Sequence, residues 1–143
     1  GIGLAPFVGL IQSHPRPESI RLLFGHRAPL ECYPYKELNG HVTATAFADN
    51  GPDDLACFLA AVQKSLADTG SAKGAMLACG PLPFLRTIQQ YACNLGVVVQ
   101  LSLEDRMGCG VGACLGCVVE SPQGEKLRVC HEGPVFQSDR VLL

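Results

Sequence analysis

Four cysteines in the last third of the sequence constrain this chain more than any other feature. They follow the spacing C-x4-C-x2-C-x12-C. The first three match plant-type [2Fe–2S] sites, in which thiolates surround a cluster and a distant fourth thiolate completes the ligand set. Structural zinc sites more often use two C-x2-C pairs. The spacing therefore predicts a [2Fe–2S] cluster, with zinc, disulfides or free thiols as the alternatives. The four residues are Cys109, Cys114, Cys117 and Cys130.

A β-hairpin is predicted to carry the fourth cysteine. Residues 117–120 and 126–130 have strand composition, and residues 121–125 have turn composition. Pairing Glu120 with Lys126 would bring Cys130 back beside Cys117. Glycines allow the preceding loop to bend tightly and to point backbone N–H groups at sulfur. These glycines are Gly108, Gly110, Gly112 and Gly116.

The part of the sequence before Glu104 alternates predicted strands with predicted helices. This alternation favours an α/β fold with a parallel, doubly wound sheet covered by helices on both faces. The composition becomes rich in glycine and cysteine after Leu103, so we expect a domain over residues 1–103 and a small hairpin module over residues 104–143. The chain begins at an apparent strand-to-helix turn, so the first strand of the sheet is expected to be missing. The predicted strands are 19–24, 42–47, 74–79 and 97–103, and the predicted helices begin near Pro6, Asp53 and Gly80.

Turns that follow the predicted strands are candidate nucleotide contacts. In a parallel α/β sheet such turns share one edge, and ligands bind in the crevice there. Glycine at these turns lets phosphate approach backbone N–H groups at the start of a helix. Each turn taken alone is more often structural, and Pro6 occupies the last glycine position of a G-x-G-x-x-G motif. The candidates are Gly1, Ile2, Gly3, Gly25, His26, Arg27, Asp49, Cys79, Gly80 and Pro81.

Composition excludes several classes of protein. Hydrophobic residues make up 48% of the chain and charged residues 17%, which supports a packed core rather than disorder. The net charge of −2 and the lack of a basic run argue against nucleic acid as a partner. No apolar segment approaches the roughly 20 residues of a membrane helix, and we expect a cytoplasmic protein. Cys32, Cys57 and Cys93 are expected to be small buried residues, and Cys79 a core or wall residue rather than a nucleophile.

Several segments together resemble a known family. Gly1–Pro6, Cys79–Pro83 and the cysteine constellation resemble the electron-transfer subunit of type B, NAD-dependent dihydroorotate dehydrogenase, in the ferredoxin reductase-like superfamily. Glu104–Cys114 is similar to the cluster loop of that family, and Gly133–Phe136 is similar to its tail. The resemblance covers nearly the whole chain, as the C-terminal part of a longer protein.

The resemblance implies a path for electrons. They pass from dihydroorotate to FMN on a partner catalytic subunit, then through the [2Fe–2S] cluster and FAD to NAD, in pyrimidine biosynthesis. FAD is expected on an N-terminal β-barrel outside these residues, so the chain alone is not expected to complete hydride transfer. Residues 1–3 and 79–81 would line the nicotinamide and diphosphate, and residues 25–27 would lie nearer the adenosine. The turn at residues 49–52 departs from the acidic turn of the family, which puts the ribose contacts in doubt.

Two other functions remain open. One is a related iron–sulfur flavoprotein subunit of a hydrogenase, sulfide dehydrogenase or ferredoxin:NADP reductase, which would share the fold and the cluster. The other is a zinc-stabilised nucleotide-binding module without redox function. The sequence also leaves NAD and NADP undecided, because Arg27 would suit a 2′-phosphate as well as a neighbouring carboxylate.

Overall fold

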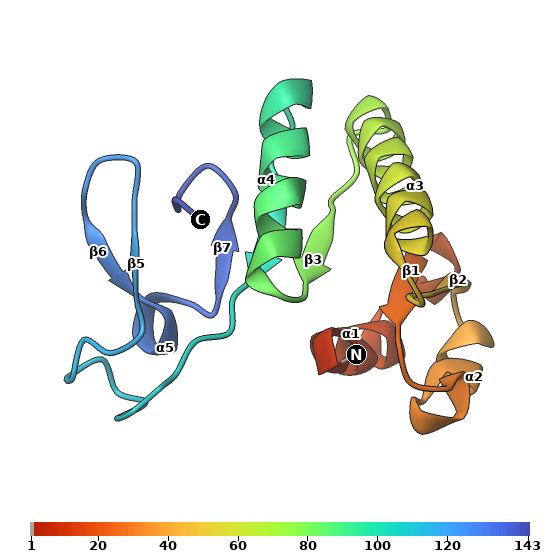
Figure 1. Cartoon of the computed structure of the whole chain (residues 1–143), viewed down its shortest axis with the longest axis horizontal. Helices are drawn as coiled ribbons and strands as arrows, with labels where there is room; N and C mark the ends of the chain where they lie inside the picture. The colour runs from red at the N-terminus through yellow and green to blue at the C-terminus, as the bar shows by residue number, and fades with distance from the viewer. Residues whose placement is uncertain (1) are drawn as a thin grey trace. The chain divides into compact units, whose positions relative to one another are not determined.

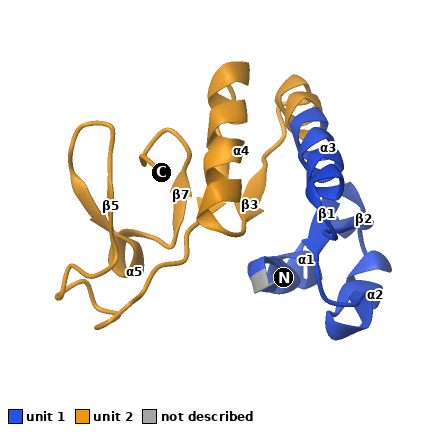
Figure 2. Ribbon diagram, in the orientation of Figure 1, with its two compact units in different colours: residues 1–64 blue, residues 65–143 orange. Residues whose placement is uncertain are grey.

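The computed structural model describes residues 2–143 and shows a mixed α/β protein with several small sheets (Figure 1). The chain divides into two compact units, residues 1–64 and residues 65–143 (Figure 2). The boundary expected at Glu104 lies inside the second unit. The reason is that a strand following the cysteine-rich segment pairs with the strand that precedes it. Gly1 lies outside the described residues.

The first unit is built on a parallel pair of strands. The register pairs Leu22 with Ala44 and Phe24 with Ala46. Because side chains alternate across a strand, Leu22 and Phe24 share one face, while Gly25 and Phe47 share the other. The elements are η1 (Ile2–Leu4), α1 (Ala5–Ser13), η2 (Pro17–Ser19), β1 (Arg21–His26), η3 (Leu30–Cys32), α2 (Tyr35–Asn39), β2 (Thr43–Ala48) and the first part of α3 (Pro52–Ser71).

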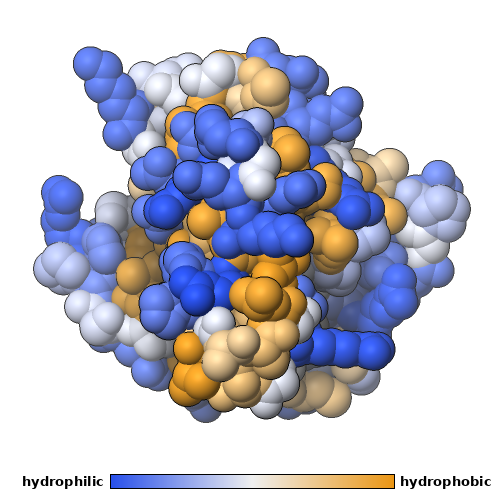
Figure 3. All heavy atoms as spheres, turned by 90° about the vertical axis from the view of Figure 1, so that its left-hand side faces the viewer, coloured by the Kyte–Doolittle hydropathy of each residue, from blue (hydrophilic) through white to orange (hydrophobic). Residues whose placement is uncertain are grey.

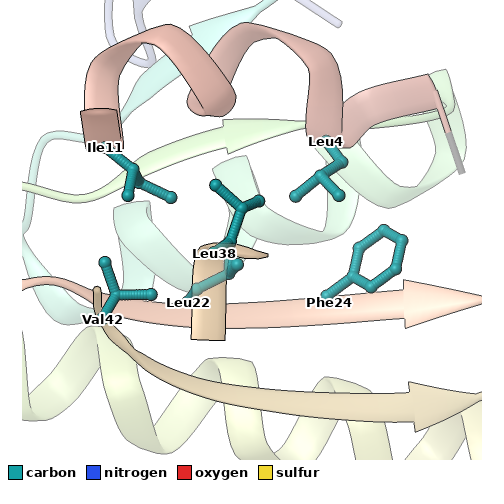
Figure 4. Close-up of a cluster of buried hydrophobic side chains, with 6 residues drawn as sticks. All are labelled: Leu4, Ile11, Leu22, Phe24, Leu38 and Val42. Carbon is teal, nitrogen blue, oxygen red and sulfur yellow. The ribbon is translucent and has the colours of Figure 1, made fainter. Parts of the chain in front are cut away.

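Hydrophobic side chains from α1, α2 and the strands form the core of this unit. The close-up shows them pointing toward one another in the space between α1 and β1 (Figure 4). The opposite face of the strands meets α3, where the rings of Phe47 and Phe58 lie 5.3 Å apart between centroids. The pair is therefore covered on both sides, as expected for a buried parallel sheet. The core residues are Leu4, Ile11, Leu22, Phe24, Leu38 and Val42.

The second unit contains a three-stranded sheet in the order β3-β4-β7. β3 and β4 are parallel, and β7 runs antiparallel to β4, a pairing that the sequence did not predict. β5 and β6 form a separate antiparallel hairpin in which Glu120 pairs with Lys126, the pairing expected from the sequence. The elements are β3 (Leu77–Cys79), α4 (Leu82–Leu95), β4 (Gln100–Ser102), β5 (Val118–Glu120), β6 (Lys126–Arg128), α5 (Val129–Glu132) and β7 (Val135–Gln137).

Local chemistry explains where α4 begins and ends. Pro83 lies in the first turn, where a missing N–H costs nothing, and Gly96 ends the helix with a φ of 64°. The buried face of α4 carries Leu85, Ile88 and Ala92. Gln89 on the same helix donates to the carbonyl oxygens of Ser138 and Val141, at 2.7 and 2.6 Å. These bonds fix the C-terminal segment to the helix.

No helix in residues 2–143 is long and apolar enough to cross a membrane. Cys32, Cys57 and Cys93 are exposed, so the expectation that they are buried was wrong. The apolar residues that surround Cys57 and Cys93 in the sequence led to that expectation. A helix buries only one face, and both cysteines lie on the other.

The core of the first unit leads to a stability prediction. Leu38 is 1% exposed and packs in the six-residue core. Leu38→Ala should lower the free energy of unfolding by about 2–5 kcal/mol, because it removes buried methyl groups and leaves a cavity. Urea unfolding followed by circular dichroism measures the change. The matched control is Leu10→Ala on α1, where the side chain is 37% exposed and the loss should be well under half as large.

Candidate functional site

The cysteine-rich loop joins β4 to β5 and has no regular secondary structure over residues 103–117 apart from bends and turns. Its path depends on left-handed backbone conformations. Gly110 has a φ of 70° and Gly112 a φ of 78°, a region in which glycine carries no steric cost. Leu115 has a φ of 56°, although it carries a side chain. The loop is thus folded back on itself, which brings Cys109 to Cys114.

Cys109 and Cys114 form one pair of thiols. The backbone N–H groups of Ala113 and Cys114 point at the Cys109 sulfur, at 3.3 and 3.5 Å. Hydrogen bonds from backbone N–H groups, that of Cys114 first and that of Val111 next, lower the pKa of Cys109 to about 6. The Cys114 thiol adds a further hydrogen bond to this sulfur. The fold therefore stabilises a thiolate at Cys109 in a solvent-exposed position.

Cys117 and Cys130 form the other pair. Cys117 is buried, and its carbonyl oxygen accepts a hydrogen bond of 2.8 Å from the N–H of Val129. The Cys130 N–H points at the Cys117 sulfur, at 3.4 Å. A hydrogen bond to Cys117, followed by burial, raises the pKa of the Cys130 thiol. The hairpin thus returns Cys130 to the side of Cys117.

The local structure at Cys130 differs from the sequence prediction. The returning strand was expected to extend to Cys130, but β6 ends at Arg128 and Cys130 lies in the short helix α5. The side chain of Glu132 accounts for the change, because it accepts a hydrogen bond of 2.6 Å from the Arg128 N–H and so ties the end of β6 to this helix. Such a local bond leaves no alternating pattern in the sequence.

The chemistry of these thiols suits an iron–sulfur cluster. Within residues 2–143 no three His, Cys, Asp or Glu side chains converge as the ligands of a single metal ion. The thiols are arranged as two pairs, and in each pair at least one backbone N–H group is directed at sulfur. In a [2Fe–2S] cluster two protein ligands bind each iron, and N–H groups directed at sulfur tune the potential. The donor set and its surroundings therefore fit such a cluster.

Sequence reasoning missed the charged residues that hold this loop. The Arg128 guanidinium binds the Glu132 carboxylate and also donates to the Gly112 carbonyl oxygen, at 3.2 Å. Hydrogen bonding and charge attraction from Arg128 lower the pKa of Glu132 to about 2. An Arg followed four residues later by Glu is a helix-type pair, which was the available signal.

Four candidate nucleotide residues of the first unit lie at the carboxyl ends of β1 and β2: Gly25, His26, Arg27 and Asp49. His26 ends β1 and its carbonyl oxygen accepts a 2.8 Å hydrogen bond from the Asp49 N–H. Arg27 Nε donates to Asp49 Oδ2 at 2.7 Å, and both residues line a cleft of about 340 Å³. The structure therefore joins Arg27 to a carboxylate, one of the two roles that the sequence left open.

Two candidate glycines have packing explanations. A side chain on Gly25 would lie 3.2 Å from the Phe58 ring, and one on Gly80 would lie 2.8 Å from the Phe84 ring. Both glycines therefore make room for aromatic side chains, whatever else they contact.

The remaining candidates lie at the ends of other elements. Cys79 ends β3, and burial raises the pKa of its thiol. A protonated, half-buried thiol fits a wall residue better than a nucleophile. Ile2 and Gly3 lie in the short helix before α1, and Pro81 precedes α4.

Comparisons with known proteins bear on both units. Residues 104–142 match the family described as the iron–sulfur cluster binding domain of dihydroorotate dehydrogenase B. The dihydroorotate dehydrogenase B (NAD(+)) electron transfer subunit of Caldanaerobacter subterraneus is 30% identical, over 99% of this chain and 56% of the relative. The electron transfer subunit homolog of Aquifex aeolicus is 52% identical over 46% of this chain and 26% of the relative.

This chain is similar in sequence to those electron transfer subunits. The resemblance inferred from the sequence is therefore confirmed. The chain spans about half the length of the Caldanaerobacter relative and about a quarter of the Aquifex one. A solved structure of an NADH-dependent reduced ferredoxin-NADP oxidoreductase covers 99% of this chain with a TM-score of 0.72 and 20% identity, over 51% of its own chain. That likeness supports the mixed α/β fold.

The lowered pKa of Cys109 leads to a prediction for the cluster-free chain. Only the thiolate reacts with iodoacetamide, and a lowered pKa places that form at lower pH. Alkylation of Cys109 should therefore rise with a midpoint at about pH 6, whereas Cys130, with a raised pKa, should react only in alkaline solution. Peptide mass spectrometry after short exposures at a series of pH values measures both sites. Equal midpoints for the two cysteines would contradict the hydrogen-bond pattern around Cys109.

Proposed function

We propose that this chain is an electron-transfer component of an NAD-dependent dihydroorotate dehydrogenase in pyrimidine biosynthesis. Electrons would arrive from dihydroorotate by way of FMN on a partner catalytic subunit and leave through FAD to NAD. The observation that carries the proposal is the two pairs of thiols inside the segment that matches the cluster-binding family. Similarity to electron transfer subunits over 99% of the chain extends it to the remaining residues.

In this proposal Cys109 and Cys114 bind one iron, and Cys117 and Cys130 bind the other. A bound [2Fe–2S] cluster accepts and releases one electron at a time. The chain supplies the four thiolates, the N–H groups that point at their sulfurs, and the hairpin that keeps Cys130 beside Cys117. Residues 104–143 act as the cluster module, and residues 1–103 as the nucleotide-binding domain.

The parallel pairs β1–β2 and β3–β4 support the proposed nucleotide-binding domain. The long helix α3 follows β2, and α4 connects β3 to β4, as in the doubly wound sheets that bind dinucleotides at the carboxyl ends of their strands. We assign NAD to these ends, with the nicotinamide and diphosphate at residues 1–3 and Cys79–Pro81. The adenosine would lie near residues 25–27 and Asp49. FAD would be bound by a flavin domain outside the 143 residues.

An exposed hydrophobic surface around the loop supports a protein partner. The side chains of Met107, Val111 and Leu115 are 44%, 69% and 60% exposed. The view from the side of β5 and β6 shows hydrophobic side chains gathered among hydrophilic ones (Figure 3). Exposed apolar side chains of this kind are typical of protein contact sites. We assign these side chains to the contact with the FMN-containing catalytic subunit.

We also propose a cytoplasmic location. The eight cysteines form no disulfides with one another, which agrees with a reducing compartment.

The first test of this proposal is the metal content of the anaerobically purified chain. A red-brown protein with about two irons per chain, and a reduced-state EPR signal from one unpaired electron, is the expected result. A colourless protein with stoichiometric zinc after reconstitution with iron and sulfide would overturn the redox function. It would leave a zinc-stabilised nucleotide-binding module in its place.

The assigned ligands lead to a second measurement on the same preparation. Cys130→Ser should abolish or strongly change the cluster absorbance and EPR signal, because a ligand of one iron is replaced by a weaker oxygen donor. The matched control is Cys93→Ser on α4, an exposed thiol outside the loop, which should leave both signals unchanged. An unaltered spectrum in Cys130→Ser would refute the assignment of the fourth ligand.

The ion pair at the strand edge predicts a preference for NAD over NADP. Asp49 offers a carboxylate to a ribose hydroxyl, and its charge opposes a 2′-phosphate while it holds Arg27. Asp49→Asn should weaken NAD binding and strengthen NADP binding by roughly fivefold, since one exposed ion pair is worth up to about 1 kcal/mol. Calorimetric titration with each nucleotide measures the ratio. In a double variant, adding Arg27→Ala to Asp49→Asn should remove the gain in NADP affinity. An unchanged ratio of NAD to NADP affinity in Asp49→Asn would contradict the assignment.

A further inference from the structure

Arg128 makes two sets of contacts that join different parts of the cysteine-rich segment. Its Nε lies 3.0 and 3.1 Å from the carboxylate oxygens of Glu132, and its Nη2 contacts the same carboxylate. The Glu132 carboxylate also accepts a hydrogen bond from the backbone N–H of Arg128. This fork holds the guanidinium in one orientation, because a planar group bound at two atoms cannot rotate freely.

The remaining donor of this guanidinium reaches the loop. Nη1 of Arg128 donates to the carbonyl oxygen of Gly112, in the middle of the arm that connects Cys109 to Cys114. Gly112 also packs closely on α5, since a side chain there would lie 3.1 Å from His131. The arm carrying one pair of thiols is thus attached to the helix that carries Cys130.

The charge of Arg128 is also placed near the other thiol pair. Its guanidinium interacts electrostatically with the sulfurs of Cys130 and Cys117. Its side chain is 33% exposed and that of Glu132 is 23% exposed, so solvent screens this charge less than that of a fully exposed arginine. A positive charge there would partly offset the negative charge of four thiolates and of the electron added on reduction.

We propose that Arg128 is a positioning residue for the cluster: it fixes the Cys109–Cys114 arm to the helix of Cys130 and raises the reduction potential of the bound cluster. The inference rests on the proposed function, since it requires that the four thiols bind iron. Attachment and charge are separable effects. A lysine retains the charge but lacks the fork that binds Glu132 and Gly112 at the same time.

Three variants of the full chain separate the two effects. Arg128→Gln should lower the midpoint potential and speed cluster loss to a chelator roughly tenfold, as replacement of outer-shell partners commonly weakens metal binding by that factor. Arg128→Lys should keep the potential near that of the unaltered chain while still losing the cluster faster. Glu132→Gln frees Arg128 without removing its charge, so cluster loss should be faster and the potential should not fall.

The matched control is Lys126→Gln, which removes a positive charge from the same strand, two residues away. It should change neither the potential nor the rate of cluster loss. The readouts are a redox titration followed by EPR, the decay of visible absorbance in the presence of EDTA, and the melting temperature of the cluster-free chain. The melting temperature should change little, because a single partly exposed ion pair contributes little to stability.

Some outcomes would overturn the inference and others the function beneath it. An unchanged potential in Arg128→Gln, or an equal fall in Lys126→Gln, would refute the role of the charge. Unchanged cluster loss in both Arg128→Lys and Glu132→Gln would refute the attachment. If Arg128→Gln retains no cluster, Glu132→Gln still tests the charge, because loss of the carboxylate that neutralises Arg128 should raise the potential, and a fall would refute the role of the charge. An unaltered chain that binds no iron after reconstitution would instead refute the proposed function itself.

Discussion

The return of the chain from Cys117 to Cys130 is the constraint on which the second unit depends. The backbone hydrogen bond from Val129 to Cys117, together with the register of β5 and β6, closes the hairpin and brings Cys130 beside Cys117. Cys117 is buried at this closure, so the pair is anchored to the core rather than carried on a free loop. The exposed arm with Cys109 and Cys114 is then positioned against this anchored pair.

The tail after α5 follows from the same closure. Gly133 has no room for a side chain, because its Cα faces the Phe136 ring and the carbonyl oxygen of Val129 lies 2.8 Å from where a Cβ would be. Phe136 in turn is buried opposite Leu101 in the pairing of β7 with β4. The cysteine-rich segment is therefore joined to the three-stranded sheet through its tail, which explains why the second unit includes both. The boundary predicted at Glu104 lies between β4 and β7, so the residues on its two sides contribute strands to one sheet.

Much of this arrangement was predictable from the sequence because it depends on local signals. The β-branched residues of β2, the glycine that ends α4 and the turn at residues 121–125 each specify their own structure. The pairing of β7 with β4 and the short helix at Cys130 were not predictable in this way. The first joins residues far apart in the sequence, and the second depends on one hydrogen bond between Arg128 and Glu132, whose four-residue spacing was its available signal. The glycines at residues 25 and 80 were ambiguous for a related reason, since a close aromatic neighbour and a bound phosphate favour the same residue.

Charge explains how the two halves of the cysteine-rich segment differ. Cys109 is exposed, and its thiolate is stabilised by backbone N–H groups of its own tight loop. Cys130 is half-buried and hydrogen-bonded to Cys117, while Arg128 supplies the nearby positive charge. Both pairs receive hydrogen bonds from backbone N–H groups, and the Cys117–Cys130 pair also lies near the charge of Arg128, which Glu132 holds in place. Loss of a backbone dipole requires refolding of the loop, whereas loss of the arginine charge requires a single substitution. The potential of a cluster bound here would therefore be set by the loop and adjusted through residue 128.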